Sequence, residues 1–321
     1  ANITDIPTVQ GRVDQFQVLH SQLGNQATFK VDGGVVEELI FLEGTKSGEI
    51  SGGILVIQNN GSVVLGFGDT SPDSLSGAVK LGANGLSVIA NGPGILQLNQ
   101  DIVIDNYCPF LAGPDFGVYT QDKLIIRSDT PQTVLIKSGG ILDLSSFTNE
   151  NMVLEFDDEA ILVMEPGAQL VLGGGVLSFV GNSHFDFRQI RSQNLPSGTS
   201  VSSSNPIRTI IAGTGTIQLK EDSRAFIGRG TVVGIETLPA CTTTTNITLN
   251  IRDRASFQMG DDASFGGSFQ IGNPVNRPGT NVSFTLNVNG IGADFELNSL
   301  GFFGMGVGIV NRTPAGAPNT W

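Results

Sequence analysis

The stretch LEFDDEAILVMEPGAQLVLGGGVLSFV, residues 154–180, repeats one pattern every eight residues. Apolar pairs separated by a single residue occur at Leu154-x-Phe156, Leu162-x-Met164 and Leu170-x-Leu172. Alternating apolar residues place their side chains on one face of a β-strand. The acidic, Gly and Pro residues between the pairs are typical of turns. The stretch therefore predicts short strands joined by tight turns.

The same pattern returns along the chain. It recurs as Ile217-x-Leu219 with Ala225-x-Ile227, as Leu249-x-Ile251 with Phe257-x-Met259, as a longer copy over 286–297, and as half copies over 55–65 and 134–144. Internal repetition of this kind is typical of stacked repeat architectures. Long amphipathic helices and alternation of strands with helices are both missing from the pattern, which excludes an α/β fold with parallel strands joined by helices.

Two all-β architectures fit this pattern, namely an antiparallel sandwich or barrel and a parallel β-helix (β-solenoid). We favour the solenoid because the expected strands are very short and one type of repeat recurs along the chain. Stacking in register also explains why like residues recur at like places, such as Phe257 with Phe295 and Met164 with Met259. The Gly-Gly-x-Gly-x-Asp repeat of calcium-binding solenoids does not occur.

We expect three regions. Residues 1–50 are predicted to form an N-terminal cap or docking arm, because Val13, Phe16, Leu19 and Leu23 have the spacing of one face of a short helix. Residues 51–312 are predicted to form the solenoid, and 313–321 a Pro-rich tail. Breaks in the repeat predict inserted loops near 106–121, 192–206 and 236–245.

Composition excludes several classes of protein. The 321 residues include 43 Gly without a Gly-x-y period, which excludes collagen. Hydrophobic residues make up 39% of the chain, which excludes a wholly disordered protein. The sequence has no apolar run of about twenty residues, so we expect no transmembrane helix. With 17 basic and 30 acidic residues and no basic stripe, nucleic acid is not an expected partner.

The sequence predicts no catalytic, cofactor-binding or metal-binding residue. His20 and His184 are the only histidines, and His184 is interpreted as a polar corner residue. The acid pairs at 157–158 and 261–262 are interpreted as solvated turn residues. The alternative, a calcium site or an acid–base pair, needs a third acid on a neighbouring coil, such as Glu159 or Asp253.

The cysteine and threonine residues also allow more than one interpretation. Cys108 and Cys241 are expected to stay unpaired and partly buried, because each coil of a solenoid touches only its neighbours. An intermolecular disulfide is the alternative. The run Thr242–Thr245 raises the question of an ice-binding surface, but such a surface needs a ladder of Thr-x-Thr pairs on one flat face. Only Thr214-x-Thr216 is evident nearby.

The stretches GAQLVLGGGVLSF (167–179) and RASFQMGDDASFGGSFQIG (254–272) resemble the passenger domains of secreted bacterial surface proteins, the autotransporters and the filamentous-haemagglutinin-like adhesins. The resemblance is one of residue types and covers 122–310 well and 50–105 weakly. It implies a right-handed parallel β-helix. It carries over no functional residue, because these families share no catalytic motif.

These observations lead to two hypotheses. The first is a non-enzymatic structural or adhesive surface protein, extracellular or on the cell surface, that self-assembles end to end into filaments and whose partners are further copies of itself and surface glycans. Export is expected from the fold type and composition, and a start at Ala1 without Met is expected to reflect processing or a removed leader.

The alternative hypothesis is a carbohydrate-binding or polysaccharide-degrading β-helix, such as a lyase, hydrolase or tailspike-like protein. Loops 106–121 and 192–206 would form a groove, and the aromatic residues Tyr107, Phe110, Phe116 and Tyr119 would stack on sugar rings. The competing interpretation is that these aromatic residues hold the loop against the body of the protein.

Overall fold

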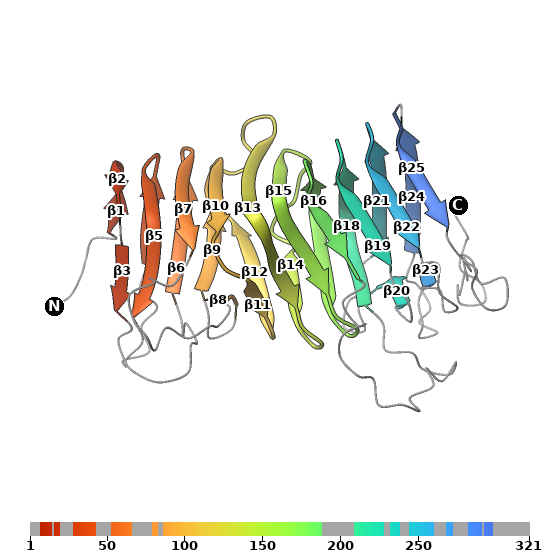
Figure 1. Cartoon of the computed structure of the whole chain (residues 1–321), viewed down its shortest axis with the longest axis horizontal. Helices are drawn as coiled ribbons and strands as arrows, with labels where there is room; N and C mark the ends of the chain where they lie inside the picture. Colours follow the sequence, from red (N-terminus) through yellow and green to blue (C-terminus); the bar gives the residue numbers. More distant parts are fainter. Residues whose placement is uncertain are drawn as a thin grey trace.

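The computed structural model is an all-β parallel solenoid whose strands stack in chain order from one end to the other (Figure 1). It describes residues 7–14, 16–19, 28–42, 53–65, 79–82, 86–187, 209–227, 232–237, 244–259, 268–271, 282–290 and 292–297. These residues form 25 strands and no helix, and the strand pairs between successive coils are all parallel. The prediction of an all-β parallel solenoid is confirmed.

Strands paired from coil to coil form three stacks, which we call faces. The first face contains β2 (Arg12–Val13), β5 (Val35–Leu42), β7 (Gly61–Leu65), β10 (Gly94–Leu98), the starts of β13 (Asp122–Ile136) and β15 (Met152–Met164), the ends of β16 (Gln169–Phe179) and β18 (Thr209–Leu219), β21 (Thr245–Arg252) and β24 (Val282–Asn289).

The second face contains β8 (Val79–Lys80), β11 (Ile102–Ile104), the ends of β13 and β15, β17 (His184–Asp186), β19 (Arg224–Ile227), β22 (Ser256–Met259) and β25 (Asp294–Leu297). The third face contains β1 (Thr8–Val9), β4 (Thr28–Asp32), β6 (Gly53–Gln58), β9 (Leu86–Ala90), β12 (Tyr107–Ala112), β14 (Ile141–Leu144), the starts of β16 and β18, β20 (Val232–Ile235) and β23 (Ser268–Ile271). Strand β3 (Phe16–Leu19) pairs with the end of β5.

The eight-residue unit of the sequence corresponds to one face. Leu154 and Phe156 lie on the first face, Leu162 and Met164 on the second, and Leu170 on the third. One coil is therefore three such units and the corners between them. Stacking in register is also confirmed, since Phe257 of β22 lies opposite Phe295 of β25.

Several strands are longer than the sequence predicts, because they continue around a corner of the coil. β13 has 15 residues and β15 has 13. The acidic turn after Phe156 is a corner within β15, where Asp158 has a left-handed backbone with φ of 54°. Likewise, the glycines at 173–175 form a corner within β16. Strand pairing with the neighbouring coil therefore shifts register at each of these corners and resumes beyond it, although sequence chemistry alone presents a strand end there.

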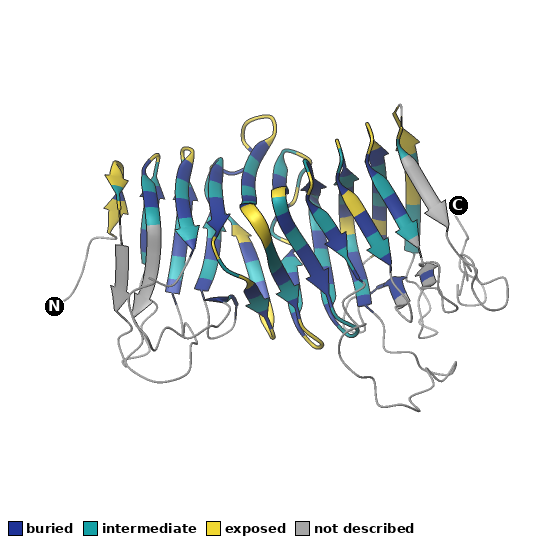
Figure 2. Ribbon diagram, viewed as in Figure 1, coloured by how far each residue is buried: buried dark blue, intermediate teal, exposed yellow. Residues whose placement is uncertain are grey.

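The core is one cluster of buried apolar residues that extends along the solenoid. Buried and intermediate residues alternate along most of the described strands (Figure 2). In the central coils this cluster is aromatic. The rings of Phe156 and Phe179 stack with centroids 5.2 Å apart, and Phe179 stacks on Phe185 at the same distance. All three side chains are buried. Phe156 and Phe179 are register partners on successive coils, whereas Phe185 meets Phe179 from the second face. Each ring gains both apolar burial and aromatic contact.

The expected cap or arm at 1–50 differs from the structure. The described residues between 8 and 42 are strands of the solenoid itself, because β4 pairs with β6 and β5 pairs with β7. The expected short helix is wrong, since β2 and β3 occupy its first part. Leu23 and residues 1–6 lie outside the described residues.

The expected loop at 106–121 is also only partly correct. Residues 107–112 form β12, which pairs with β9 on one side and β14 on the other. Asn106 and residues 113–121 lie outside a strand. Tyr107, Pro109 and Phe110 are thus accommodated in a regular strand, whereas Pro114, Phe116 and Tyr119 lie in the shorter loop that follows it. The predicted loop at 192–206, most of the one at 236–245 and the tail at 313–321 lie outside the described residues.

Candidate functional site

No pair of acid and base groups suited to catalysis is evident among the described residues. His184 is half-buried on β17, and its ring lies 5.8 Å from that of Phe226. His20, Cys241 and the acids at 261–262 lie outside the described residues. Cys108 is a free and buried thiol, and burial raises its pKa to about 12. A thiol that holds its proton so strongly is a poor nucleophile.

The acidic turn residues bond neighbouring coils to one another. The backbone N–H of Gly181 donates to Glu221 Oε2 at 3.1 Å, and the backbone N–H of Glu221 donates to Asp253 Oδ2 at 3.2 Å. Asn182 donates to Glu159 at 3.1 Å. Within the described ranges, His, Cys, Asp and Glu side chains form no group of three or more that would hold a metal ion. Glu221 and Asp253 therefore accept hydrogen bonds from backbone amides at the corners, and Glu159 accepts one from a side-chain amide.

One charged pair lies unusually deep for an outward position. Lys123 Nζ lies 2.8 Å from Glu155 Oε1, and Glu155 is only 3% exposed. Its other oxygen, Oε2, has no hydrogen-bond partner, and neither has the hydroxyl of Ser178, which lies opposite it in register. Ser178 is fully buried, so its hydroxyl is closed to an external substrate. The cluster therefore has a structural role in the packing of β13, β15 and β16.

The aromatic residues proposed for sugar stacking are not all available. Phe110 and Phe116 are each 1% exposed, and Phe116 packs edge-on against Phe147 at 5.0 Å. Tyr107 and Tyr119 are exposed, and the hydroxyl of Tyr107 donates to Asp143 Oδ2 at 2.7 Å. That hydrogen bond raises the pKa of Tyr107 to about 12. The prediction that these aromatic residues stack on sugar rings is wrong for Phe110 and Phe116, which hold this segment against the body of the protein.

An ordered polar surface lies on the first face near the C-terminal end. Outward residues of β18, β21 and β24 align in three rows, which we call the ladder surface: Thr214–Asn246–Ser283, Thr216–Thr248–Thr285 and Gln218–Asn250–Asn287. All nine side chains are uncharged hydrogen-bonding groups. Ser283 Oγ donates to Asn246 Oδ1, and Asn287 Nδ2 donates to Asn250 Oδ1 at 2.9 Å.

The middle row of the ladder surface has free hydroxyls. Thr216 and Thr248 are half-buried and Thr285 is exposed. Within the part of the chain that the structure describes, their hydroxyls have no hydrogen bond to another side chain or to the backbone. These hydroxyls are therefore not engaged by other groups of the described part of the protein.

Sequence reasoning found Thr214 and Thr216 but missed the rest of the ladder surface. The signal is the recurrence of polar-x-Thr-x-polar at Thr214, Asn246 and Ser283. The intervals between these positions are unequal, because successive coils contain different insertions. Only the strand register shows that the three segments align.

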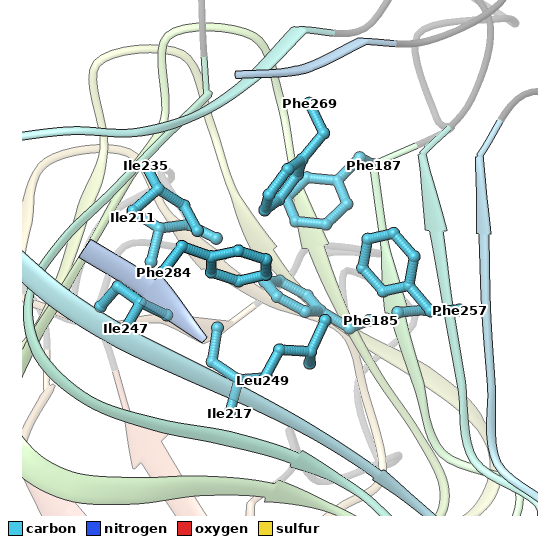
Figure 3. Close-up of a pocket in the computed structure, with 11 residues that line it drawn as sticks. Phe185, Phe187, Ile211, Ile217, Ile235, Ile247, Leu249, Phe257, Phe269 and Phe284 are labelled. Atoms are coloured by element: carbon cyan, nitrogen blue, oxygen red, sulfur yellow. The ribbon is translucent and has the colours of Figure 1, made fainter. Parts of the chain in front are cut away.

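A small cavity lies inside the solenoid near the same coils (Figure 3). Its lining is entirely apolar: Phe185, Phe187, Ile211, Ile217, Ala225, Ile235, Ile247, Leu249, Phe257, Phe269 and Phe284. The cavity volume is about 10 Å³, at the lower limit for one water molecule. The cavity is therefore a gap in core packing and not a site for an organic ligand.

The core becomes exposed at the last described strand of the first face. Leu249 and Ile251 of β21 are 4% and 0% exposed. Their register partners in β24, Leu286 and Val288, are 37% and 43% exposed. The inward column that is covered at β21 is thus partly open at β24.

The fold defines the chain as a parallel β-solenoid. Comparison with known proteins adds no closer assignment: no family model, no curated protein and no solved structure matched the chain. The resemblance to bacterial surface proteins therefore has support from the parallel solenoid fold alone. Over the described residues, helices long and apolar enough to cross a membrane were not found.

Proposed function

We propose that this protein is a non-enzymatic, extracellular structural or adhesive solenoid that assembles end to end into filaments. The observation that carries the proposal is the exposure of Leu286 and Val288, whose register partners Leu249 and Ile251 on the preceding coil are buried. An open solenoid end presents apolar side chains and unpaired strand edges. A second copy seated on that end would continue the stack, and a head-to-tail contact of this kind propagates into a filament.

The non-enzymatic part of the proposal has two supports. The acids at the corners are committed to backbone amides of neighbouring coils, as for Glu221 and Asp253. The one buried serine beside a lysine–glutamate pair, Ser178, is closed to solvent. Location at the cell surface rests on the resemblance in residue pattern and on the fold class. We also propose a right-handed winding, since about 98% of parallel crossover connections have that hand.

Negative-stain electron microscopy across a concentration series tests the assembly. We expect fibres of constant width for the wild type and isolated short rods for Val288→Asp, because a carboxylate at the open end disfavours burial against a second copy. Val118→Asp is the matched control, because Val118 is 62% exposed and lies far from this end. Fibres from Val288→Asp, or only monomeric rods from the wild type at high concentration, would contradict end-to-end assembly.

A further inference from the structure

We propose that the ladder surface binds the flat face of an ordered, neutral polysaccharide. The inference rests on the proposed adhesive function and names the surface and the partner chemistry. The first observation is the charge of the ladder surface. The chain carries a net charge of −13, yet the nine residues of the ladder surface are all uncharged. A neutral surface offers no Coulomb attraction to a charged polymer, whereas its hydroxyl and amide groups complement a neutral, hydroxyl-covered one.

The regularity of the surface indicates a partner that also repeats. Neighbouring strands lie about 4.8 Å apart, and outward residues within a strand recur about every 6.6 Å. The residues in the rows through Thr216 and Gln218 keep these two spacings across three strands, because the register between β18, β21 and β24 contains no shift. Hydrogen bonds between Asn250 and Asn287 and between Asn246 and Ser283 join the β21 and β24 members of the outer rows. The middle row of threonine hydroxyls is left for the partner.

An ordered partner fits better than a soluble oligosaccharide. The ladder surface has no aromatic side chain, so it offers no stacking platform to capture a single sugar ring. Its binding energy would come from many weak hydrogen bonds, each of small net value. Such contacts yield affinity when they form together and when the partner is already ordered, because little conformational entropy is then lost.

Co-sedimentation of the full chain with microcrystalline cellulose and with crystalline chitin tests the inference. We expect the wild type to bind at least one of these solids. The triple variant Thr216→Val, Thr248→Val, Thr285→Val keeps side-chain shape and strand propensity but removes the three free hydroxyls, and we expect it to bind at least about tenfold more weakly. Thr248→Lys, which places a charge at the centre of the grid, should also reduce binding.

Thr133→Val is the matched control, because Thr133 points outward from the second-face part of β13. It should bind like the wild type, and circular dichroism should show a native fold in every variant. Failure of the wild type to bind either solid, or undiminished binding by the triple variant, would overturn the inference. The inference would also be overturned if the variants lost binding only because the ladder surface mediates self-association of the protein. A preference of the wild type for ice crystals over both polysaccharides would overturn it as well.

Electron microscopy of the same variants separates this inference from the proposed assembly. The triple valine variant should still form filaments, because the ladder surface faces sideways and the open end is unchanged. If it forms filaments but has lost binding, the inference is supported. If the wild type forms no filaments yet binds through the ladder surface, the assembly proposal fails and the binding inference stands.

Discussion

Asn287 donates a hydrogen bond from Nδ2 to Oδ1 of Asn250, 2.9 Å away. The two residues are 37 positions apart in the sequence but lie directly opposite each other on β24 and β21. The contact exists only because successive coils stack in register. The hydrogen bond therefore contributes to the free energy with which the last described coil packs on the coil before it.

A double-mutant cycle with Asn250→Ala and Asn287→Ala should show a coupling free energy of about 0.5–1.5 kcal/mol, because each single substitution already removes the shared hydrogen bond. Chemical denaturation of the four proteins measures it. The cycle of Thr248→Ala and Thr285→Ala is the control, since these residues share the same register without a hydrogen bond between them. A coupling as large in the control pair would show that packing, and not the amide bond, links the coils.

A second prediction concerns the corner between the third and first faces in β18. Gly213 has φ of 88°, and a Cβ atom there would collide with the backbone oxygen of Leu172 on the preceding coil. Gly213→Ala should therefore cost more than about 3 kcal/mol, since it combines left-handed strain with a clash against an immobile backbone.

Gly139→Ala isolates the strain from the clash. Gly139 has a similar φ of 83°, but no atom lies within 4 Å of the added Cβ. We expect a cost of about 1–2 kcal/mol there. Thermal unfolding followed by circular dichroism compares the two variants. Equal destabilisation would show that close approach between coils contributes nothing at Gly213.

The sequence predicts the faces of this solenoid better than its corners. Leu154, Leu162 and Leu170 recur at eight residues because each face needs one inward pair, and that signal survives in a single sequence. The corner after Phe156 is different. Acids and left-handed residues there have the chemistry of a strand end, yet pairing with the neighbouring coil resumes after a register shift, and the strand continues. Strand length therefore depends on pairing between coils, which local residue types do not encode.

The same reasoning explains two failures near the ends of the chain. Val13 and Phe16 are three residues apart because a corner separates β2 from β3, and this spacing mimics a helix face. The ladder surface was missed because insertions make coil lengths unequal, so that Thr216, Thr248 and Thr285 show no fixed period. Both features need the three-dimensional register, whereas the apolar pairs do not.

A third prediction follows from the cavity near the C-terminal coils. Ala225 lies in register between Phe185 and Phe257, and its small side chain lines the gap. Ala225→Val should stabilise the protein by about 0.5–1 kcal/mol, because added methyl groups fill apolar space and suit a strand. The midpoint of thermal unfolding measures the gain.

Ala160→Val is the matched control for that substitution. Ala160 is fully buried and lies on β15, outside the cavity. The larger side chain should overpack that position and cost about 1–3 kcal/mol. A loss of stability from Ala225→Val as large as that from Ala160→Val would mean that the coils around the cavity cannot accommodate the additional volume.

The last prediction concerns the pH dependence of stability at the corner of β15. Burial, together with the negative charge of Asp157, raises the pKa of Asp158 above its ordinary value of 3.8. A raised carboxyl pKa means that the folded state holds the proton more tightly than the unfolded state. Ionisation therefore opposes folding: the penalty is absent below pH 3.8, where both states are protonated, and is complete above the raised pKa.

Asp158→Asn removes this penalty and keeps a residue type that tolerates the left-handed backbone at this position. Because Asp158 is exposed, solvent screening limits the gain to roughly 0.2–0.5 kcal/mol at neutral pH. Urea denaturation at pH 7 and pH 3 should show stabilisation at the higher pH and none at the lower. Glu150→Gln, at an exposed acid in another turn, is the control. An equal gain at both pH values would assign the effect to backbone preference, and the charge of Asp158 would then have no part in it.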